Sequence, residues 1–131
     1  MESKDTSSKQ PARLINFSYL DELSEDDVEF KISMINQFIN NAPEIISEMR
    51  SLCESKDWES LRRLAHKFKP QLGFMGILSV YNEVEKIEHN SDKKANLEQI
   101  PDSIDSINDV CNKAILELRE EAEKLSGKDK Q

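Results

Sequence analysis

The chain has little glycine or proline and no long apolar run. Three glycines and four prolines among 131 residues leave no glycine-rich loop for a nucleotide phosphate, which excludes ATP-dependent kinase chemistry. No apolar stretch approaches the roughly 18 residues of a membrane span, and the N-terminus lacks an apolar signal segment, so we expect no membrane contact. The formal net charge of -8 argues against general nucleic-acid binding, which needs a basic surface.

Cysteine is also scarce, and both copies lie within helical patterns of apolar residues. Cys53 and Cys111 are therefore predicted to be buried free thiols. Free thiols persist in a reducing compartment, so we expect a cytoplasmic protein.

The remaining sequence is rich in Leu, Ile, Glu, Lys and Ser, and its apolar residues recur at the spacing of amphipathic helices. Ser24 and Asp57 are expected to cap helices at their N-termini. Asn40-Asn41 and the polar stretch 90–99 are expected to interrupt them, with Pro43 opening a new helix. The expected helical stretches are 17–23, 28–39, 43–53, 57–72, 77–87 and 101–125.

Short connections between such helices predict antiparallel neighbours. The fold class that we expect is all-α, an up-and-down antiparallel four-helix bundle with one additional short N-terminal helix. A single bundle domain is expected over 13–126, between a disordered tail over 1–12 and a frayed tail over 127–131.

One stretch departs from the acidic character of the chain. Acidic residues fill 26 of 131 positions, so the 22 residues from Leu61 to Asn82 should hold about four, yet they hold none. Four cations lie in this stretch around a single histidine, His66: Arg62, Arg63, Lys67 and Lys69. This clustering is typical of a site that meets negative charge.

The helical spacing indicates where His66 points. With about 100° between successive residues, His66 lies roughly 140° from the apolar stripe of its helix and faces solvent. Its helical neighbours are two cations and two residues without long side chains: Arg62, Lys69, Pro70 and Gly73. An indifferent surface histidine has the same pattern, and we interpret His89, which lies beside acidic residues, in that way.

The surroundings of His66 limit its chemistry. No second His, Cys or carboxylate lies three or four residues away, which argues against a metal site. No glycine-framed serine or orienting carboxylate is evident, which argues against a hydrolytic triad. A neutral imidazole can attack a phosphoryl group, and neighbouring cations favour the neutral ring and offset the phosphoryl charge.

The stretch from Ala65 to Gly76 resembles the signature of histidine-containing phosphotransfer (HPt) domains, the modules of multistep phosphorelays. Ala65, Phe68, Lys69 and Gly76 occupy the expected places around His66. The segment 38–45 and Trp58 resemble the family as well, and the resemblance spans roughly 17–125. It implies that His66 accepts the phosphoryl group, that Lys69 contacts its oxygens and that Gly76 permits close packing at the helix end.

Pro70 departs from the family pattern, which commonly has glycine four residues after the histidine. Because proline lacks the N–H that would bond the carbonyl of His66, we expect a kink or a loosened turn there. The side chain stays short, so Pro70 does not block an incoming protein.

The resemblance also implies a docking face around His66 for receiver domains of response regulators and of a hybrid histidine kinase. Met34 and Gln37 lie off the core stripe of their helix and are either docking residues or the edge of the bundle. The expected partner-binding residues are Arg62, Lys67, Pro70, Gly73, Phe74, Met34 and Gln37. We expect a monomer, because this face must stay open.

The function expected is that of a phosphorelay intermediate with no catalytic activity of its own. His66 would accept a phosphoryl group from a receiver-domain aspartate and pass it to the aspartate of another receiver. No bound cofactor is expected, and Mg²⁺ is expected on the partner receiver domain, because we expect the face around His66 to carry no carboxylates. The alternative is a non-catalytic helical adaptor that binds a signalling partner through the same face, with His66 unmodified.

Overall fold

The computed structural model describes residues 14–130, and side chains through Gly127, as a bundle of four long helices with short additions. The elements in chain order are α2 (Ser18–Ser24), α3 (Val28–Glu54), α4 (Trp58–Met75), α5 (Leu78–Lys93), the short 3₁₀ helix η1 (Leu97–Gln99) and α6 (Ile100–Lys130). No strand occurs in this part of the chain. The predicted all-α bundle with a short N-terminal helix is therefore confirmed.

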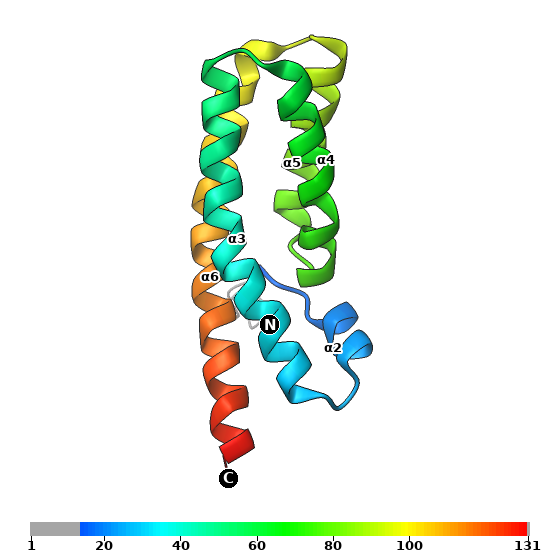
Figure 1. The fold of residues 1–131 in the computed structure, drawn as a ribbon, viewed down its shortest axis with the longest axis vertical. Helices are drawn as coiled ribbons and strands as arrows, with labels where there is room; N and C mark the ends of the chain where they lie inside the picture. Colours follow the sequence, from blue (N-terminus) through cyan, green and yellow to red (C-terminus); the bar gives the residue numbers. More distant parts are fainter. Residues whose placement is uncertain (1–13, 131) are drawn as a thin grey trace, which may run out of the picture.

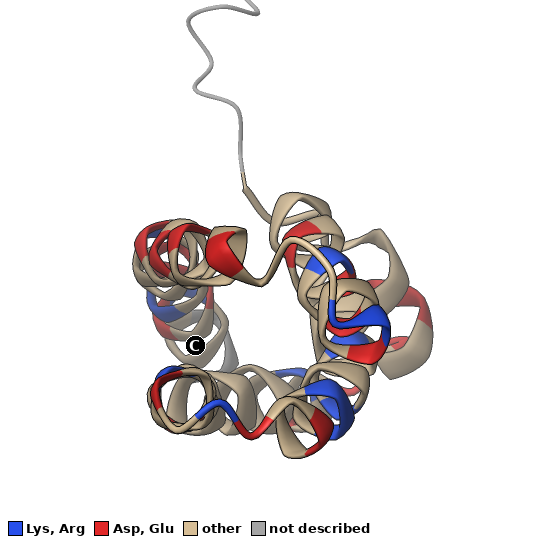
Figure 2. Ribbon diagram, turned by 90° about the horizontal axis from the view of Figure 1, so that it is seen from above, with Lys and Arg blue, Asp and Glu red and all other residues tan. Residues whose placement is uncertain are grey.

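The four long helices form two adjacent antiparallel pairs. Helix α3 lies along α6, α4 lies along α5, and α2 crosses near the end of α4 (Figure 1). The view along the bundle shows the long helices around a common centre, with acidic and basic positions on several sides (Figure 2). Among the described residues, no helix is both long and apolar enough to cross a membrane.

The helix starts confirm one predicted cap and correct another. The Asp57 carboxylate accepts a hydrogen bond from the backbone N–H of Ser60 at 3.2 Å and caps α4, as expected. Ser24 does not cap α3, since it is the last residue of α2 and its buried hydroxyl donates to the carbonyl of Leu20. Asp27 caps α3 instead. Ser and Asp are equally good caps, so residue type alone does not decide between them.

The predicted break at Asn40-Asn41 is wrong, because α3 runs for 27 residues straight through Pro43. A continuous buried stripe crosses the expected break at helical spacing: Ile35, Phe38, Ala42, Ile46 and Met49. Packing of this stripe outweighs the one helical hydrogen bond that the exposed Pro43 removes.

The predicted loop over 90–99 is also largely wrong. Helix α5 continues to Lys93, and Asn90 and Ser91 are buried despite their polarity. Only 94–96 separate α5 from η1, with positive φ angles of 52° at Lys94 and Asn96 that turn the chain sharply.

The C-terminal end of the bundle differs from the predicted boundary at residue 126. Helix α6 continues past residue 126 and through Gly127 to Lys130, because one glycine costs a helix only about 1 kcal/mol. The predicted disordered tail over 1–12, like Gln131, lies outside the described residues.

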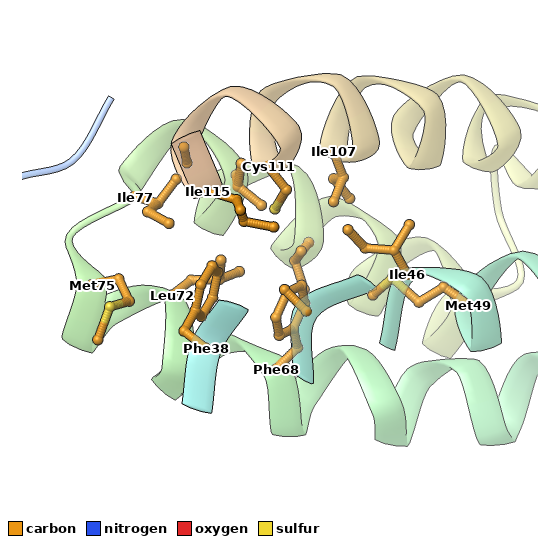
Figure 3. Close-up of a cluster of buried hydrophobic side chains, with 14 of the residues drawn as sticks. Phe38, Ile46, Met49, Phe68, Leu72, Met75, Ile77, Ile107, Cys111 and Ile115 are labelled. Carbon is orange, nitrogen blue, oxygen red and sulfur yellow. The ribbon is translucent and has the colours of Figure 1, made fainter. Parts of the chain in front are cut away.

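The core lies between the two helix pairs and contains one of the two thiols. Phe38 of α3 and Phe68 of α4 stack with ring centroids 6.2 Å apart, and Leu72 and Ile107 belong to the same buried cluster (Figure 3). Cys111 is fully buried, and burial raises the pKa of its thiol to about 12. The prediction of buried free thiols is confirmed for Cys111, whereas Cys53 is free and half-buried.

The segment before α2 packs against the end of α4. Helix α4 ends at Met75 and is capped by Gly76, which has a left-handed φ of 68°. The backbone N–H of Asn16 donates to the Gly76 carbonyl at 3.1 Å, and the N–H of Leu14 donates to the Glu117 carboxylate. A Cβ on Gly76 would lie 2.0 Å from the Asn16 carbonyl oxygen, so only glycine fits there.

Lys31, whose side chain is largely buried, holds α2 against the bundle. The Lys31 ammonium pairs with Asp21 of α2 and with Glu121 of α6 at 3.2 Å, and it lies 5.1 Å from the centre of the Phe17 ring. Burial opposes its charge, but the hydrogen bonds to both carboxylates raise the pKa of Lys31 above its usual value. This one cation therefore joins α2, α3 and α6.

The contact at Gly76 predicts a large effect of a small substitution. Gly76→Ala should lower the free energy of unfolding by at least about 2 kcal/mol, because it adds left-handed strain and a clash with Asn16. Denaturant unfolding measures this change. Gly73→Ala is the matched control, since a Cβ there meets nothing within 4 Å and should leave stability unchanged or raise it by up to about 1 kcal/mol. Equal effects at the two positions would contradict the account.

Candidate functional site

Helix α4 presents His66 to solvent, as the sequence predicts. The side chain is 68% exposed. The buried residues of the same helix lie on the other side and anchor it in the core: Leu61, Ala65, Phe68, Leu72 and Met75. The imidazole is therefore accessible, while the backbone that carries it is fixed by packing.

A carboxylate from the neighbouring helix contacts this histidine. Glu88 of α5 places one carboxylate oxygen 2.8 Å from Nδ1 of His66 and the other 2.7 Å from Nζ of Lys69. The side chains of Glu88 and Lys69 are only 19% and 17% exposed. One largely buried carboxylate thus joins the exposed imidazole to the cation one turn further along α4.

The expectation of a face without carboxylates is wrong. The acid-free stretch covers α4 from Leu61 onward and the start of α5, but acidic residues later in α5 pack against the His66 side of α4. A groove, called here the charged groove, is lined by Arg62, Lys69, Glu85, Glu88, His89 and Asp92. Glu88 is also the orienting carboxylate that the sequence did not reveal. The spacing of Glu85, Glu88 and Asp92 on one face of α5 was the available signal.

The ion pair keeps both partners charged at neutral pH. Burial alone would raise the pKa of Glu88, but the hydrogen bonds from Lys69 and His66 outweigh it and lower the pKa of this carboxyl below its usual range. The hydrogen bond to Glu88 raises the pKa of Lys69, although partial burial opposes this. Lys69 is therefore a cation paired with Glu88, rather than the unpaired cation that the sequence suggests.

The contact with Glu88 selects one form of the neutral imidazole. A carboxylate only accepts hydrogen bonds, so Nδ1 of His66 carries the proton and Nε2 keeps its lone pair. Nε2 belongs to a ring that is mostly exposed, so an electrophile can approach it. In this arrangement Glu88 holds the ring in place and Nε2 is free to act as a nucleophile.

The arginines of α4 are tied to an acidic residue on their own helix. Arg62 lies 2.7 Å and Arg63 lies 3.0 Å from the Glu59 carboxylate. Arg62 also lies 4.0 Å from Asp92 in the charged groove. Lys67 and Pro70 are exposed, and α4 runs without interruption through Pro70. The cations thus surround His66 without all contacting it.

The other flank of α4 carries an apolar groove. It lies between α3 and α4 and is lined by Met34, Gln37, Phe38, Gln71, Phe74 and Met75. Phe74 is held from outside by Tyr19 of α2, with the two rings stacked 5.5 Å apart. Three residues expected from the sequence, Met34, Gln37 and Phe74, are thus brought together. His66 lies on the ridge between this apolar groove and the charged groove.

No cluster of metal ligands is evident near these grooves. Within the part of the chain that the structure describes, no group of three or more His, Cys, Asp or Glu side chains is arranged to hold a metal ion. Both carboxylate oxygens of Glu88 already contact His66 and Lys69, so this residue is not free to act as a ligand.

The lowered pKa of Glu88 predicts a stability difference that depends on pH. A carboxyl whose pKa is lower in the folded state stabilises the fold above its unfolded value, about 4.3, and this contribution disappears as the pH falls through the folded value. Glu88→Gln should therefore cost about 1 kcal/mol of unfolding free energy at pH 7 and almost nothing near pH 2. Denaturant unfolding at several pH values measures the difference.

The control for this prediction is Glu85→Gln, since Glu85 lies about one turn earlier on α5 and is exposed. It should change stability by less than about 0.5 kcal/mol at either pH. A Glu88→Gln difference that stayed constant down to pH 2 would show that the ionised carboxylate is not the stabilising group.

Comparisons with known proteins agree with this geometry. The family model described as Hpt domain matches residues 33–127, which include α4, α5 and the His66 site. The fold is similar to the crystal structure of histidine-containing phosphotransfer protein B (HptB) from Pseudomonas aeruginosa PAO1. The TM-score is 0.79 at 18% identity, covering 86% of this chain and 97% of that chain. A search of curated proteins gave no match.

The family match covers most of the chain and includes the exposed histidine, its lysine neighbour and the helix that supplies Glu88. The chain therefore belongs to the Hpt domain family, the histidine phosphotransfer modules of phosphorelays.

Proposed function

We propose that His66 is the phospho-accepting residue of a phosphorelay intermediate. The observation that supports this most strongly is the exposed imidazole held through Nδ1 by Glu88, because it leaves Nε2 as an accessible nucleophile. His66 would take the phosphoryl group from a receiver-domain aspartate and pass it to the aspartate of a second receiver.

The transfer balances without a further reactant. The lone pair of Nε2 attacks phosphorus, a P–N bond forms, and the P–O bond to the aspartyl oxygen breaks to release the receiver carboxylate. The second receiver reverses these steps with its own aspartate. Lys69 would contact the phosphoryl oxygens, and Arg62 and Lys67 would add positive field around them.

The metal ion for the transfer is expected to come with the partner receiver domain. We propose that Mg²⁺ arrives with the receiver domain, because Glu88, the nearest carboxylate to His66, is already held by Lys69. We also propose that this chain carries out no ATP chemistry and that it is a monomer, which leaves the His66 face open. A cytoplasmic location is part of the proposal and is consistent with the free thiols.

A transfer assay tests the assignment of His66. A phosphorylated receiver domain with Mg²⁺ should give an acid-labile, base-stable label on the wild type and at least about 100-fold less on His66→Gln, because the nucleophile is removed. His89→Gln is the control and should be labelled like the wild type, since His89 lines the charged groove but makes no hydrogen bond to His66.

Two other outcomes of this assay would contradict the proposal. Label that persists on His66→Gln would mean that another residue accepts the phosphoryl group. No label on the wild type from any of several receivers would favour the adaptor function, in which His66 stays unmodified.

The face around His66 also supports a docking proposal. The receiver domain would cover His66 and lie over the apolar groove, where Met34, Gln37 and Phe74 offer contact area. Pro70 and Gly73 continue the same ridge of α4 and carry no long side chain, so a partner backbone can approach closely. Arg62 and Lys67 would border this contact.

A charge placed in the apolar groove separates docking from chemistry. Met34→Lys should slow transfer from a receiver domain by about tenfold, because burial of the new ammonium opposes docking. Labelling by phosphoramidate, a donor too small to use the groove, should keep its wild-type rate. Leu116→Lys, on α6 and 61% exposed, is the control and should slow neither reaction. Equal slowing with both donors would show that the apolar groove is not part of the docking surface.

A further inference from the structure

We infer that Pro70 makes this chain selective among receiver domains. It leaves the backbone carbonyl of His66 without its helical partner, so a receiver that covers this carbonyl must bring a hydrogen-bond donor. The inference rests on the proposed function of His66. It goes beyond that function, because it names a specificity-determining residue and the chemical group that a suitable partner must carry.

The proline within α4 removes one backbone donor at a defined place. Helix α4 runs without interruption from Trp58 to Met75 and contains Pro70. In an α-helix the N–H of residue 70 donates to the carbonyl of residue 66, but proline has no N–H. The proline ring also crowds this carbonyl, which favours an outward tilt. The carbonyl of His66 is thus an acceptor that its own helix does not satisfy.

No side chain in the described part of the chain replaces the missing donor. The side chains that donate to backbone carbonyls there are Ser24 and Ser55, and both bond residues just before them in the sequence. His66 and Pro70 are both exposed, so in the free protein water can bond this carbonyl. The acceptor therefore depends on solvent until a partner covers it.

The same face of α4 stays free of long side chains beyond the imidazole. Gly73 follows His66 by seven residues, which is about 20° short of two full helical turns, and Pro70 lies between them. A Cβ at Gly73 would meet nothing within 4 Å. A partner that docks over this face therefore lies against the helix backbone.

Docking changes the cost of the free carbonyl. A receiver whose aspartate reaches Nε2 of His66 covers the turn that follows this residue and displaces water from it. A buried acceptor without a donor lowers affinity by about 10- to 100-fold. A receiver with an N–H or an ammonium group opposite the carbonyl avoids this loss, whereas one with an apolar group does not. Pro70 thus adds a penalty against unsuitable partners.

The other proline within a helix provides a matched control. Pro43 lies inside α3, is exposed, and removes the corresponding hydrogen bond to the carbonyl of Ile39. Nine residues separate it from Met34 of the apolar groove, so the two lie about 180° apart around α3. A receiver on the His66 side therefore does not cover the carbonyl that Pro43 frees.

The experiment measures transfer to the full chain from a panel of purified receiver domains, each phosphorylated with acetyl phosphate and Mg²⁺. Each rate is divided by the rate at which phosphoramidate labels the same variant, so that changes in the reactivity of His66 cancel. In Pro70→Ala an N–H again satisfies the carbonyl. The slowest receivers should therefore accelerate by about tenfold, while the fastest should not accelerate.

Two further variants make the result specific. Pro43→Ala should leave the relative rates within about twofold of the wild type, although it also restores a helical hydrogen bond and should raise the Tm as Pro70→Ala does. Pro70→Gly restores the same N–H but removes the side chain as well. It should therefore narrow the range of rates as much as Pro70→Ala.

A direct measurement follows the carbonyl itself. In His89→Gln protein with ¹³C in the histidine carbonyl, His66 carries the label of the described chain, and isotope-edited infrared spectroscopy reports its hydrogen bonding. With the fastest receiver bound, the band should keep the frequency of a hydrogen-bonded carbonyl. With the slowest receiver bound at saturating concentration, the band should move to higher frequency, because the acceptor is covered without a donor.

The outcomes separate this inference from the proposed function. An equal change for every receiver, or no change, in Pro70→Ala would overturn the inference while leaving His66 as the acceptor. Narrowing in Pro70→Gly alone would also overturn it, because the bulk of the ring would then select the receiver. Absence of label on wild-type His66 from both phosphoramidate and every receiver would overturn the proposed function, and this inference with it.

Discussion

The antiparallel packing of α4 against α5 is the constraint on which the site depends. Ala65 and Phe68 of α4 and Val84 and Ile87 of α5 are fully buried, and they fix the rotation of both helices about their own axes. With those rotations set, His66 faces solvent and Glu88 faces the seam, the line along which α4 and α5 meet beside His66. Core packing therefore positions both His66 and Glu88, and neither side chain depends on a loop for its position.

The seam combines a rigid support with an open nucleophile. A largely buried carboxylate is costly unless it is paired, and Lys69 supplies that pair at 2.7 Å. His66 uses the second oxygen of the same carboxylate but remains 68% exposed. The energy of the ion pair therefore holds Glu88, and Glu88 in turn orients a ring that a partner protein can still reach.

The parts of the structure that the sequence predicts are those that depend on one helix at a time. The periodicity of α4 is enough to place His66 on the solvent side, and the Asp57 cap depends only on its own helix start. The four-helix arrangement follows from repeated amphipathic stripes with short connections. Cys111 lies in such a stripe, and its burial follows from the same pattern.

The features that the sequence did not predict depend on relations between helices or between competing signals. The contact of Glu88 with His66 needs the register of α5 against α4, which periodicity within either helix does not contain. The local signal of Pro43 suggests a new helix, but the buried stripe through Ala42 and Ile46 prevails. Ser24 and Asp27 compete as caps with similar strength, and the extended backbone of Asp27 decides between them only in the folded chain.

The measurement that tests the central claim most directly is ¹⁵N NMR of the imidazole after the protein has been phosphorylated by a receiver domain. The coupling to phosphorus identifies which ring nitrogen carries the phosphoryl group. The account predicts that Nε2 of His66 is phosphorylated and that Nδ1 keeps its proton beside Glu88. A phosphoryl group on Nδ1, or on any residue other than His66, would contradict it.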